Sequence, residues 1–239
     1  MAARSEDRPP ARTPLSKERV LQAAVRLADR DGVEALTMRK LAHELGVEAM
    51  SLYYHIANKE EILDGVVDVV VEEIIAEAEK VEARQPSGGW KDAVRQRILT
   101  ARAVLLRHPW APGVIESRTS VSPAIMAYID SVLGLLRQGG FSYDLAHHGM
   151  HALGSRALGF TQELFVPANS SGDGDEEDDD TAAMLEQMAG QFPNLTGMLA
   201  EIAHDDPDAT LGWCDDQSEF EFGLDLILDG LERLRIAAS

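Results

Sequence analysis

Residues 38–59, MRKLAHELGVEAMSLYYHIANK, contain the pattern that decides the fold of this chain. Two short helical patterns flank Gly46, where a turn needs the positive φ that glycine adopts without strain. Ala42 is small where the two helices would cross, and apolar residues on both sides supply a shared core. These core residues are Leu41, Leu45, Val47 and Leu52. The spacing predicts a helix-turn-helix, with Thr37 capping its first helix and a second helix from Glu48 to about Ile56.

The side chains that this packing turns outward predict a DNA-reading surface. Those at the start of the second helix reach base edges in a major groove, and they are Ala49, Met50, Ser51 and Tyr54. The donors around them suit phosphate oxygens, and they are Arg39, Lys40, Tyr53, His55 and Lys59. A plain helical hairpin is the alternative. Two adjacent exposed tyrosines in a chain with 5% aromatic residues favour binding.

Outside this motif almost every segment also has helical periodicity, and no stretch alternates apolar and polar residues as strands do. We therefore predict an all-α fold. Ser16 caps a first helix that Gly32 ends, and Asn58 caps a long helix to about Glu82, with Glu61 at the capping-box position. Further helices are predicted at Trp90–Arg107, Pro123–Gln138, Ser142–Phe165, Thr181–Gly190, Asn194–His204 and from Asp216 onward.

Length and composition exclude several classes of protein. A chain of 239 residues with 45% hydrophobic residues forms one large domain or two small ones. No apolar run reaches the roughly 18 residues of a membrane span, and the N-terminus has no apolar signal-peptide core. Cys214 is the single cysteine, which excludes an internal disulfide. These features predict a cytoplasmic protein that does not enter the membrane.

The charge is distributed unevenly along the chain. There are 22 Lys and Arg against 41 Asp and Glu, a net charge of −19. Residues 1–59 nevertheless carry 10 basic and 8 acidic side chains, a balance of +2, so residues 60–239 carry −21. Only the N-terminal quarter is therefore suited to approach a polyanion, and the acidic remainder would repel DNA.

The stretch LSKERVLQAAVRLADRDGVEALTMRKLAHELGVEAMSLYYHIANKEEIL, residues 15–63, resembles the DNA-binding domain of the tetracycline-repressor family of bacterial transcription regulators. The resemblance implies a homodimer that binds double-stranded operator DNA, with the third helix of each subunit in the major groove. It also implies an operator-contacting set made up of Met38, Arg39, Ala49, Met50, Ser51, Tyr53, Tyr54, His55 and Lys59. We predict an arm over residues 1–14, a DNA-binding domain over 15–65, and a ligand-binding and dimerisation domain over 66–239 with an acidic flexible loop at 168–180.

The rest of the chain resembles the repressor's C-terminal domain more weakly, through Trp90, Gly140-Phe141-Ser142, Leu158-Gly159 and FGLDLILDGLERL at residues 222–234. The resemblance implies an inducer pocket and dimerisation through the two last long helices. The last helix carries an apolar stripe that we expect one subunit to leave partly uncovered, and hence to bury between subunits. The stripe consists of Phe220, Leu224, Ile227, Leu228 and Leu231.

A small-molecule effector is predicted to contact one face of the helix from Ser142. His147, Met150, His151 and Gly154 recur along that face, and the resemblance adds Arg97 and Ala101. Core packing is the alternative for all of them. The founder of the family binds tetracycline and magnesium through histidines, which this chain replaces with Ile75 and with Val114 or Ile115, although Glu163 remains. We therefore expect a mainly apolar effector bound without magnesium, and no cofactor.

We predict a homodimeric DNA-binding repressor that a small-molecule effector releases from its operator, and three other functions remain open. A regulator that responds to no effector, or a transcriptional activator, would share these motifs. A metal-dependent enzyme using His147 and His151 is a remote alternative, because no third ligand has a defined spacing. The chain also has no phosphate-binding glycine loop and no nucleophile motif, so we predict that it is not an enzyme.

Overall fold

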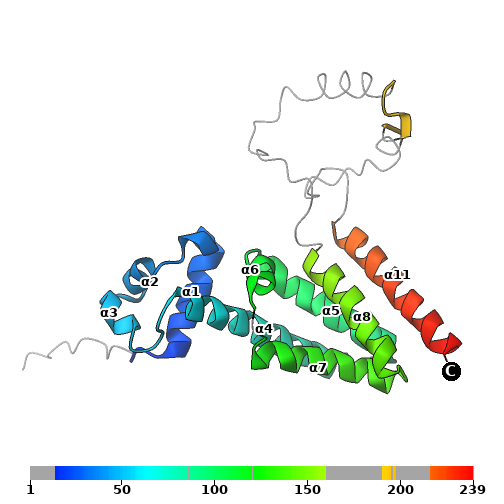
Figure 1. Cartoon of the computed structure of the whole chain (residues 1–239), viewed down its shortest axis with the longest axis horizontal. Coiled ribbons are helices and arrows are strands. Elements are labelled where there is room, and N and C mark those ends of the chain that lie inside the picture. The colour runs from blue at the N-terminus through cyan, green and yellow to red at the C-terminus, as the bar shows by residue number, and fades with distance from the viewer. Residues whose placement is uncertain are drawn as a thin grey trace, which may run out of the picture. The chain divides into compact units, whose positions relative to one another are not determined.

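The computed structural model describes residues 14–85, 87–119, 121–159, 190–194, 196–197 and 216–238 (Figure 1). In these ranges the regular structure is helical and contains no strand, as predicted. The N-terminal arm, the acidic stretch at 168–180 and most of the two helices predicted between 181 and 204 lie outside them. None of the described helices is both long and apolar enough to span a bilayer.

The helices follow the predicted order closely. Their bounds are α1 Lys17–Asp31, η1 Val33–Ala35, α2 Met38–Leu45, α3 Ala49–Leu52, α4 Lys59–Arg84, α5 Trp90–Arg107, α6 Ala111–Ser117, α7 Pro123–Gln138, α8 Tyr143–Gly159 and α11 Asp216–Ala237. The chain divides into two compact units. The first comprises residues 1–86 and 100–131, and the second comprises 87–99 and 132–239. Helix α4 runs unbroken past residue 65, and the domain boundary expected there remains a prediction.

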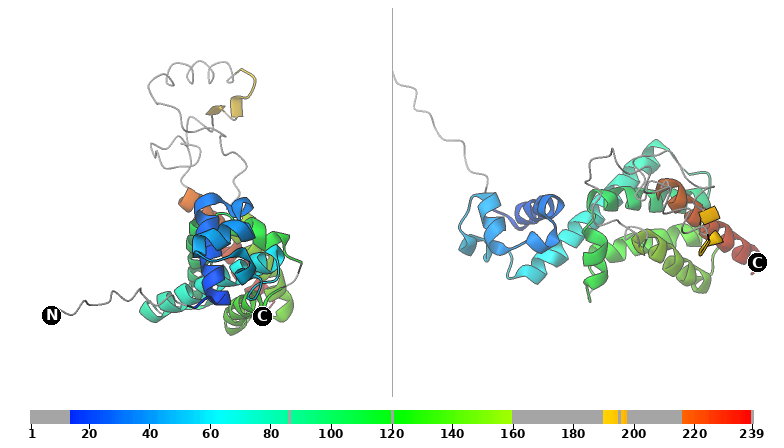
Figure 2. Two further views of the ribbon diagram at one scale, coloured as in Figure 1. Left: turned by 90° about the vertical axis from the view of Figure 1, so that its left-hand side faces the viewer. Right: turned by 90° about the horizontal axis from the view of Figure 1, so that it is seen from above.

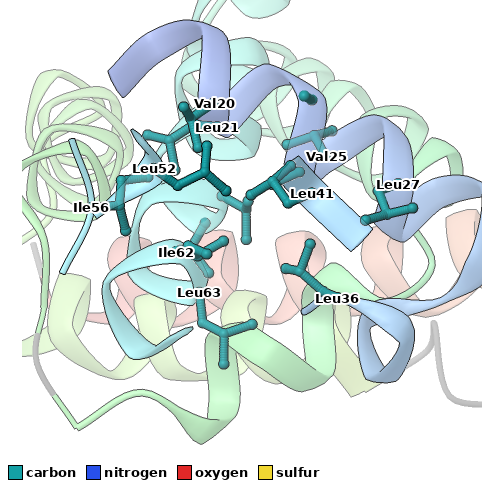
Figure 3. Close-up of a cluster of buried hydrophobic side chains, with 14 of the residues drawn as sticks. Val20, Leu21, Val25, Leu27, Leu36, Leu41, Leu52, Ile56, Ile62 and Leu63 are labelled. Atoms are coloured by element: carbon teal, nitrogen blue, oxygen red, sulfur yellow. The ribbon is translucent and has the colours of Figure 1, made fainter. Parts of the chain in front are cut away.

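Helices α1, α2 and α3 and the first turns of α4 surround one buried cluster, and we call this part of the first unit the head (Figure 2). Side chains from all four helices point toward one another in Figure 3. Val20, Leu41, Leu52 and Ile62 are completely buried there. At about 25 cal/mol per Å² of apolar surface, this burial is the main stabilising term available to such short helices.

Capping side chains set where the head helices begin. The backbone N–H of Arg19 donates to Ser16 Oγ, and that of Lys40 donates to Thr37 Oγ1, each at a distance of 3.2 Å. Asn58 accepts from the Glu61 N–H at 2.9 Å. Glu61 in turn accepts from the N–H of Ala57 at 2.8 Å, one residue before the position a standard capping box would use. The predicted caps at the starts of α1, α2 and α4 are therefore confirmed.

Two details of the first unit differ from the predictions. Helix α3 spans four residues instead of about nine, because Tyr53–His55 form a tighter turn in which the His55 N–H donates to the Leu52 carbonyl at 2.8 Å. Helix α6 was not predicted, since Pro112 and Gly113 indicate a break. Proline is tolerated in the first turn of a helix, and Ala111, Pro112 and Val114 are buried, so packing stabilises α6.

The second unit has its own core, to which α11 contributes most of one face. Phe220, Leu224 and Leu228 are fully buried and Leu231 is 6% exposed, while Ile227 packs against the same cluster. Helix α8 contacts α11 directly, and Gly149 faces the Leu231 side chain. The expectation that a single subunit leaves this stripe uncovered is therefore wrong. Apolar periodicity shows that a helix face is buried, but it does not show which partner covers it.

Candidate nucleic-acid interface

The turn between α2 and α3 takes its shape from Gly46. Its φ of 65° and ψ of 35° are left-handed, and its N–H donates to carbonyls of the last turn of α2. The Val47 N–H then bonds to the Ala42 carbonyl at 3.0 Å, which directs the chain into α3. Leu52 and Ile56 are buried and hold α3 on the core. The predicted helix-turn-helix is confirmed, including the positive φ at the glycine.

The side of α3 and of the following turn that faces away from this core presents large side chains to solvent. Tyr54 is 88% exposed, Met50 70% and Tyr53 47%. Ser51 and His55 are half-buried. Exposing three large apolar or aromatic groups next to one another gives the folded chain no packing benefit, so this surface is suited to contact a partner.

Two of the residues predicted to contact DNA are less accessible than the others. Met38 and Ala49 are half-buried and pack against the head core. Part of each side chain therefore stabilises the head, and only the remainder faces outward. Burial of this kind depends on the exact rotation of each helix, which the sequence pattern does not specify.

The cations of the head fall into two groups. Lys17 pairs with Glu61 at 2.7 Å, and Arg30 pairs with Asp31 and Glu44. The hydrogen bond from Lys17, with that from the Ala57 N–H, lowers the pKa of Glu61. In contrast, Arg39 and Lys59 are exposed, and neither forms an ion pair with any residue that the structure describes.

Lys40 is also exposed, although Asp31 lies near enough to interact with its charge. Arg39 and Lys59 are thus exposed at the start of α2 and the start of α4. A phosphate can replace water around a free cation without breaking an existing ion pair, so Arg39 and Lys59 are suited to bind a phosphate backbone.

The predicted effector residues are less clearly grouped. His147 and His151 are exposed on α8 with their rings 4.6 Å apart, whereas Met150 packs against the core of the second unit. A Cβ added at Gly154 would meet no heavy atom within 4 Å. Arg97 is half-buried and belongs to the second unit, and Ala101 is buried in the first.

No metal site supports the enzyme alternative. In the described ranges, no three side chains from His, Cys, Asp or Glu are grouped so that they would hold an ion. His147 and His151 therefore have no third ligand there. Glu163 lies outside the described residues.

Comparisons with known proteins agree with this geometry. The family described as "Bacterial regulatory proteins, tetR family" matches residues 20–66, and "Tetracyclin repressor-like, C-terminal domain" matches residues 82–235. The fold and the exposed helix-turn-helix thus define a DNA-binding transcription regulator. The chain belongs to the tetracycline-repressor family.

Individual relatives extend over nearly the whole chain. The HTH-type transcriptional repressor DrrR1 of Streptomyces coeruleorubidus is 32% identical over 236 residues, which are 95% of this chain and 82% of the relative. The class D tetracycline repressor protein of Escherichia coli is 27% identical over 220 residues, 91% of this chain and 89% of its own.

Solved structures show the same relationship. Apo ActR from Streptomyces coelicolor has a TM-score of 0.71 and 29% identity, covering 96% of this chain and 100% of its own. ActR in complex with actinorhodin has a TM-score of 0.68 and 28% identity, and the match covers 93% of this chain and 99% of its own.

Proposed function

We propose that this regulator is a homodimeric repressor, that α3 of each subunit reads operator bases, and that a small molecule releases it from DNA. Met50, Ser51 and Tyr54 contact base edges, while Arg39 and Lys59 bind phosphates. The observation that carries this assignment is the exposure of Tyr54 and Met50, together with two exposed head cations, Arg39 and Lys59, that have no acidic partner among the described residues. Because it acts on DNA, we place the protein in the cytoplasm.

The dimer interface is proposed on the outer face of α11 instead of its buried stripe. Phe222 is 65% exposed and Leu226 53% exposed, and the two lie one turn apart, opposite the buried side chains. A second copy of this chain is the proposed occupant, since tetracycline-repressor relatives resemble this chain along almost its whole length. Phe222→Asp should give a monomer that keeps its helical content, which sedimentation and circular dichroism would measure. A dimer in that variant would contradict the assignment.

The effector is proposed to be a mainly apolar molecule that binds without magnesium. Ile75 and Ile115, which replace the founder's histidines, are half-buried and pack in the first unit's core, and Val114 is 7% exposed. The relative ActR is described in complex with actinorhodin, which makes that compound a reasonable first probe. An effector can release DNA only by binding more tightly to the conformation that does not fit the operator.

Selection from a random-sequence duplex library tests the DNA-reading surface directly. The wild-type protein should enrich a palindromic duplex, and the Tyr53→Ala, Tyr54→Ala double variant should bind that duplex far more weakly. Tyr143→Ala is the matched control, because Tyr143 is 68% exposed on α8, which carries no proposed DNA contact. Equal loss of affinity in both proteins, or no loss in the double variant, would contradict the assignment.

Thermal shift and DNA release test the effector. A ligand at 100 times its dissociation constant should stabilise the protein by about 2.7 kcal/mol. Actinorhodin and tetracycline, each with and without magnesium, are the probes. His151→Ala should weaken the response to the active probe, while His148→Ala, an exposed neighbour on α8, should not. A response to tetracycline that requires magnesium would contradict the proposed effector class.

A further inference from the structure

His108 lies between two carboxylates from different helices of the first unit. His108 as a whole is 7% exposed. The Nδ1 atom is 2.7 Å from Asp29 Oδ1 on α1, and the Nε2 atom is 3.3 Å from Glu73 Oε2 on α4. The imidazole therefore joins the segment between α5 and α6 to both of these helices.

Each neighbouring group has a defined hydrogen-bonding role. The Trp110 indole N–H donates to Asp29 Oδ1 at 2.6 Å, and Arg107 donates to Glu73 Oε1 at 2.5 Å. Burial alone would raise the pKa of Glu73, but the hydrogen bonds from Arg107 and His108 lower it, so the carboxylate stays ionised. Both groups that face the imidazole nitrogens therefore accept hydrogen bonds and offer none.

A neutral imidazole does not satisfy this arrangement. One ring nitrogen of neutral histidine carries a proton and the other carries a lone pair. With Nδ1–H donating over the shorter distance to Asp29, the lone pair of Nε2 would face the ionised Glu73. Two acceptors, the lone pair of the buried ring and a carboxylate whose side chain is 35% exposed, would then oppose each other at 3.3 Å, which is unfavourable.

We propose that His108 is held as an imidazolium, and that the proton on Nε2 makes it a positioning residue that ties α4 to the rest of the first unit. Removing the proton keeps the contact to Asp29 but breaks the contact to Glu73. Glu73 lies 14 residues after Lys59, about 21 Å along α4 from the head end of that helix. The lost contact gives α4 more freedom, and DNA binding must then restrict that freedom at a cost in affinity.

The structure therefore predicts that operator affinity depends on a proton remote from DNA. This consequence rests on the proposed DNA-reading surface, whereas the protonation state of His108 does not. The experiment spans neutral pH, because histidine is the side chain that ordinarily changes charge there. The experiment has one arm for each statement.

The first arm is a long-range ¹H–¹⁵N spectrum of the histidine rings in the full-length protein at about pH 7, without DNA. Comparison with His108→Gln identifies the His108 signals. Both of its nitrogens should show the chemical shifts of protonated imidazolium nitrogens. A neutral ring with one protonated nitrogen would overturn the proposal, whatever the operator measurements give.

The second arm compares operator affinity between about pH 6 and about pH 9 for the wild type and Glu73→Gln, using the duplex recovered by selection. A glutamine oxygen can accept from Arg107 while its amide N–H donates to the neutral Nε2, so this variant does not need the proton. Wild-type affinity should fall by about fivefold more than that of the variant over this range, the lower end of typical coupling between sites.

Glu77→Gln is the matched control, since it removes a carboxylate one turn further along α4 that binds Lys80 at 2.8 Å instead of His108. It should keep the pH dependence of the wild type. His43 and His55 of the head are the same in all three proteins, so their contribution cancels in the comparison. Parallel curves for the wild type and Glu73→Gln would overturn the proposal, and absence of operator binding in every protein would instead contradict the DNA-reading surface.

Discussion

The head and the second unit of this protein each bury an apolar core, but their helices differ in length and in how they begin and end. In the head, α1, α2 and α4 begin at capping side chains, α1 and α2 end at glycines, and α3 has only four residues. Tyr54, Arg39 and Lys59 are exposed at its surface. The second unit uses α8 and α11, of 17 and 22 residues, packed along their lengths. Its cations Lys91 and Arg95 are bound to acidic residues of α11. Local capping and turn residues thus set the helix bounds in the region suited to bind DNA, whereas two long packed helices make up much of the second unit.

The largest expected effect tests burial in the second unit. Leu228→Ala removes a completely buried side chain and should lower the free energy of unfolding by about 2–5 kcal/mol. Leu234→Ala on the same helix removes a side chain that is 56% exposed, and should change it by less than about 0.5 kcal/mol. Denaturant titration at one protein concentration measures both. Similar values for the two variants would show that the α11 stripe is not core.

A smaller effect tests the turn chemistry of the head. Gly46→Ala forces a Cβ into left-handed backbone and should cost about 1–2 kcal/mol, although the Cβ meets no heavy atom within 4 Å. The same substitution at Gly113 in α6 also meets no atom, and should stabilise by about 0.5–1 kcal/mol because the backbone there is helical. Effects of the same sign would contradict the described turn.

The free cations of the head give a smaller effect, seen only with DNA. Lys59→Ala should weaken binding to every duplex to a similar extent and lower the slope of log affinity against log salt by about one. Lys17→Ala is the control, since Lys17 is already paired with Glu61. Equal salt slopes for Lys59→Ala and the wild type would remove Lys59 from the contact set.

The smallest effect concerns the paired cations of the second unit. Lys91 lowers the pKa of Asp229, and Gln217 and Arg95 lower the pKa of Glu221. A carboxylate with a lowered folded-state pKa adds stability above its unfolded pKa and loses it as the pH falls through the folded value. The difference in denaturation midpoint between the wild type and Asp229→Asn should therefore be present at neutral pH, begin to fall below about pH 4, and vanish once the pH is below the lowered pKa of Asp229. A difference that persists in acid would exclude this ion pair as its cause.

The head was the more predictable of the two regions because its signals are local. Ser16, Thr37, Gly46 and Asn58 each act on backbone groups within a few residues, so a sequence pattern identifies them. The partner of the α11 stripe comes from residues far away in the sequence, so periodicity alone could not show that the same subunit covers the stripe.

The His108 site could not be predicted from sequence for a similar reason. Asp29, Glu73 and His108 are separated by 44 and 35 residues, and no motif indicates that they meet. Helix α6 was missed because proline and glycine suggest a loop, while its buried residues are decided by packing in the first unit.

Protection of Met50 against oxidation tests the central claim most directly. Met50 is 70% exposed on α3 and Met126 is 52% exposed on α7, so both should form sulfoxides readily in the free protein. Peptide mass spectrometry would follow both residues with and without the selected operator duplex. The DNA-reading surface described above predicts slow oxidation of Met50 and unchanged oxidation of Met126 in the complex. Equally rapid oxidation of Met50 with and without operator would contradict it.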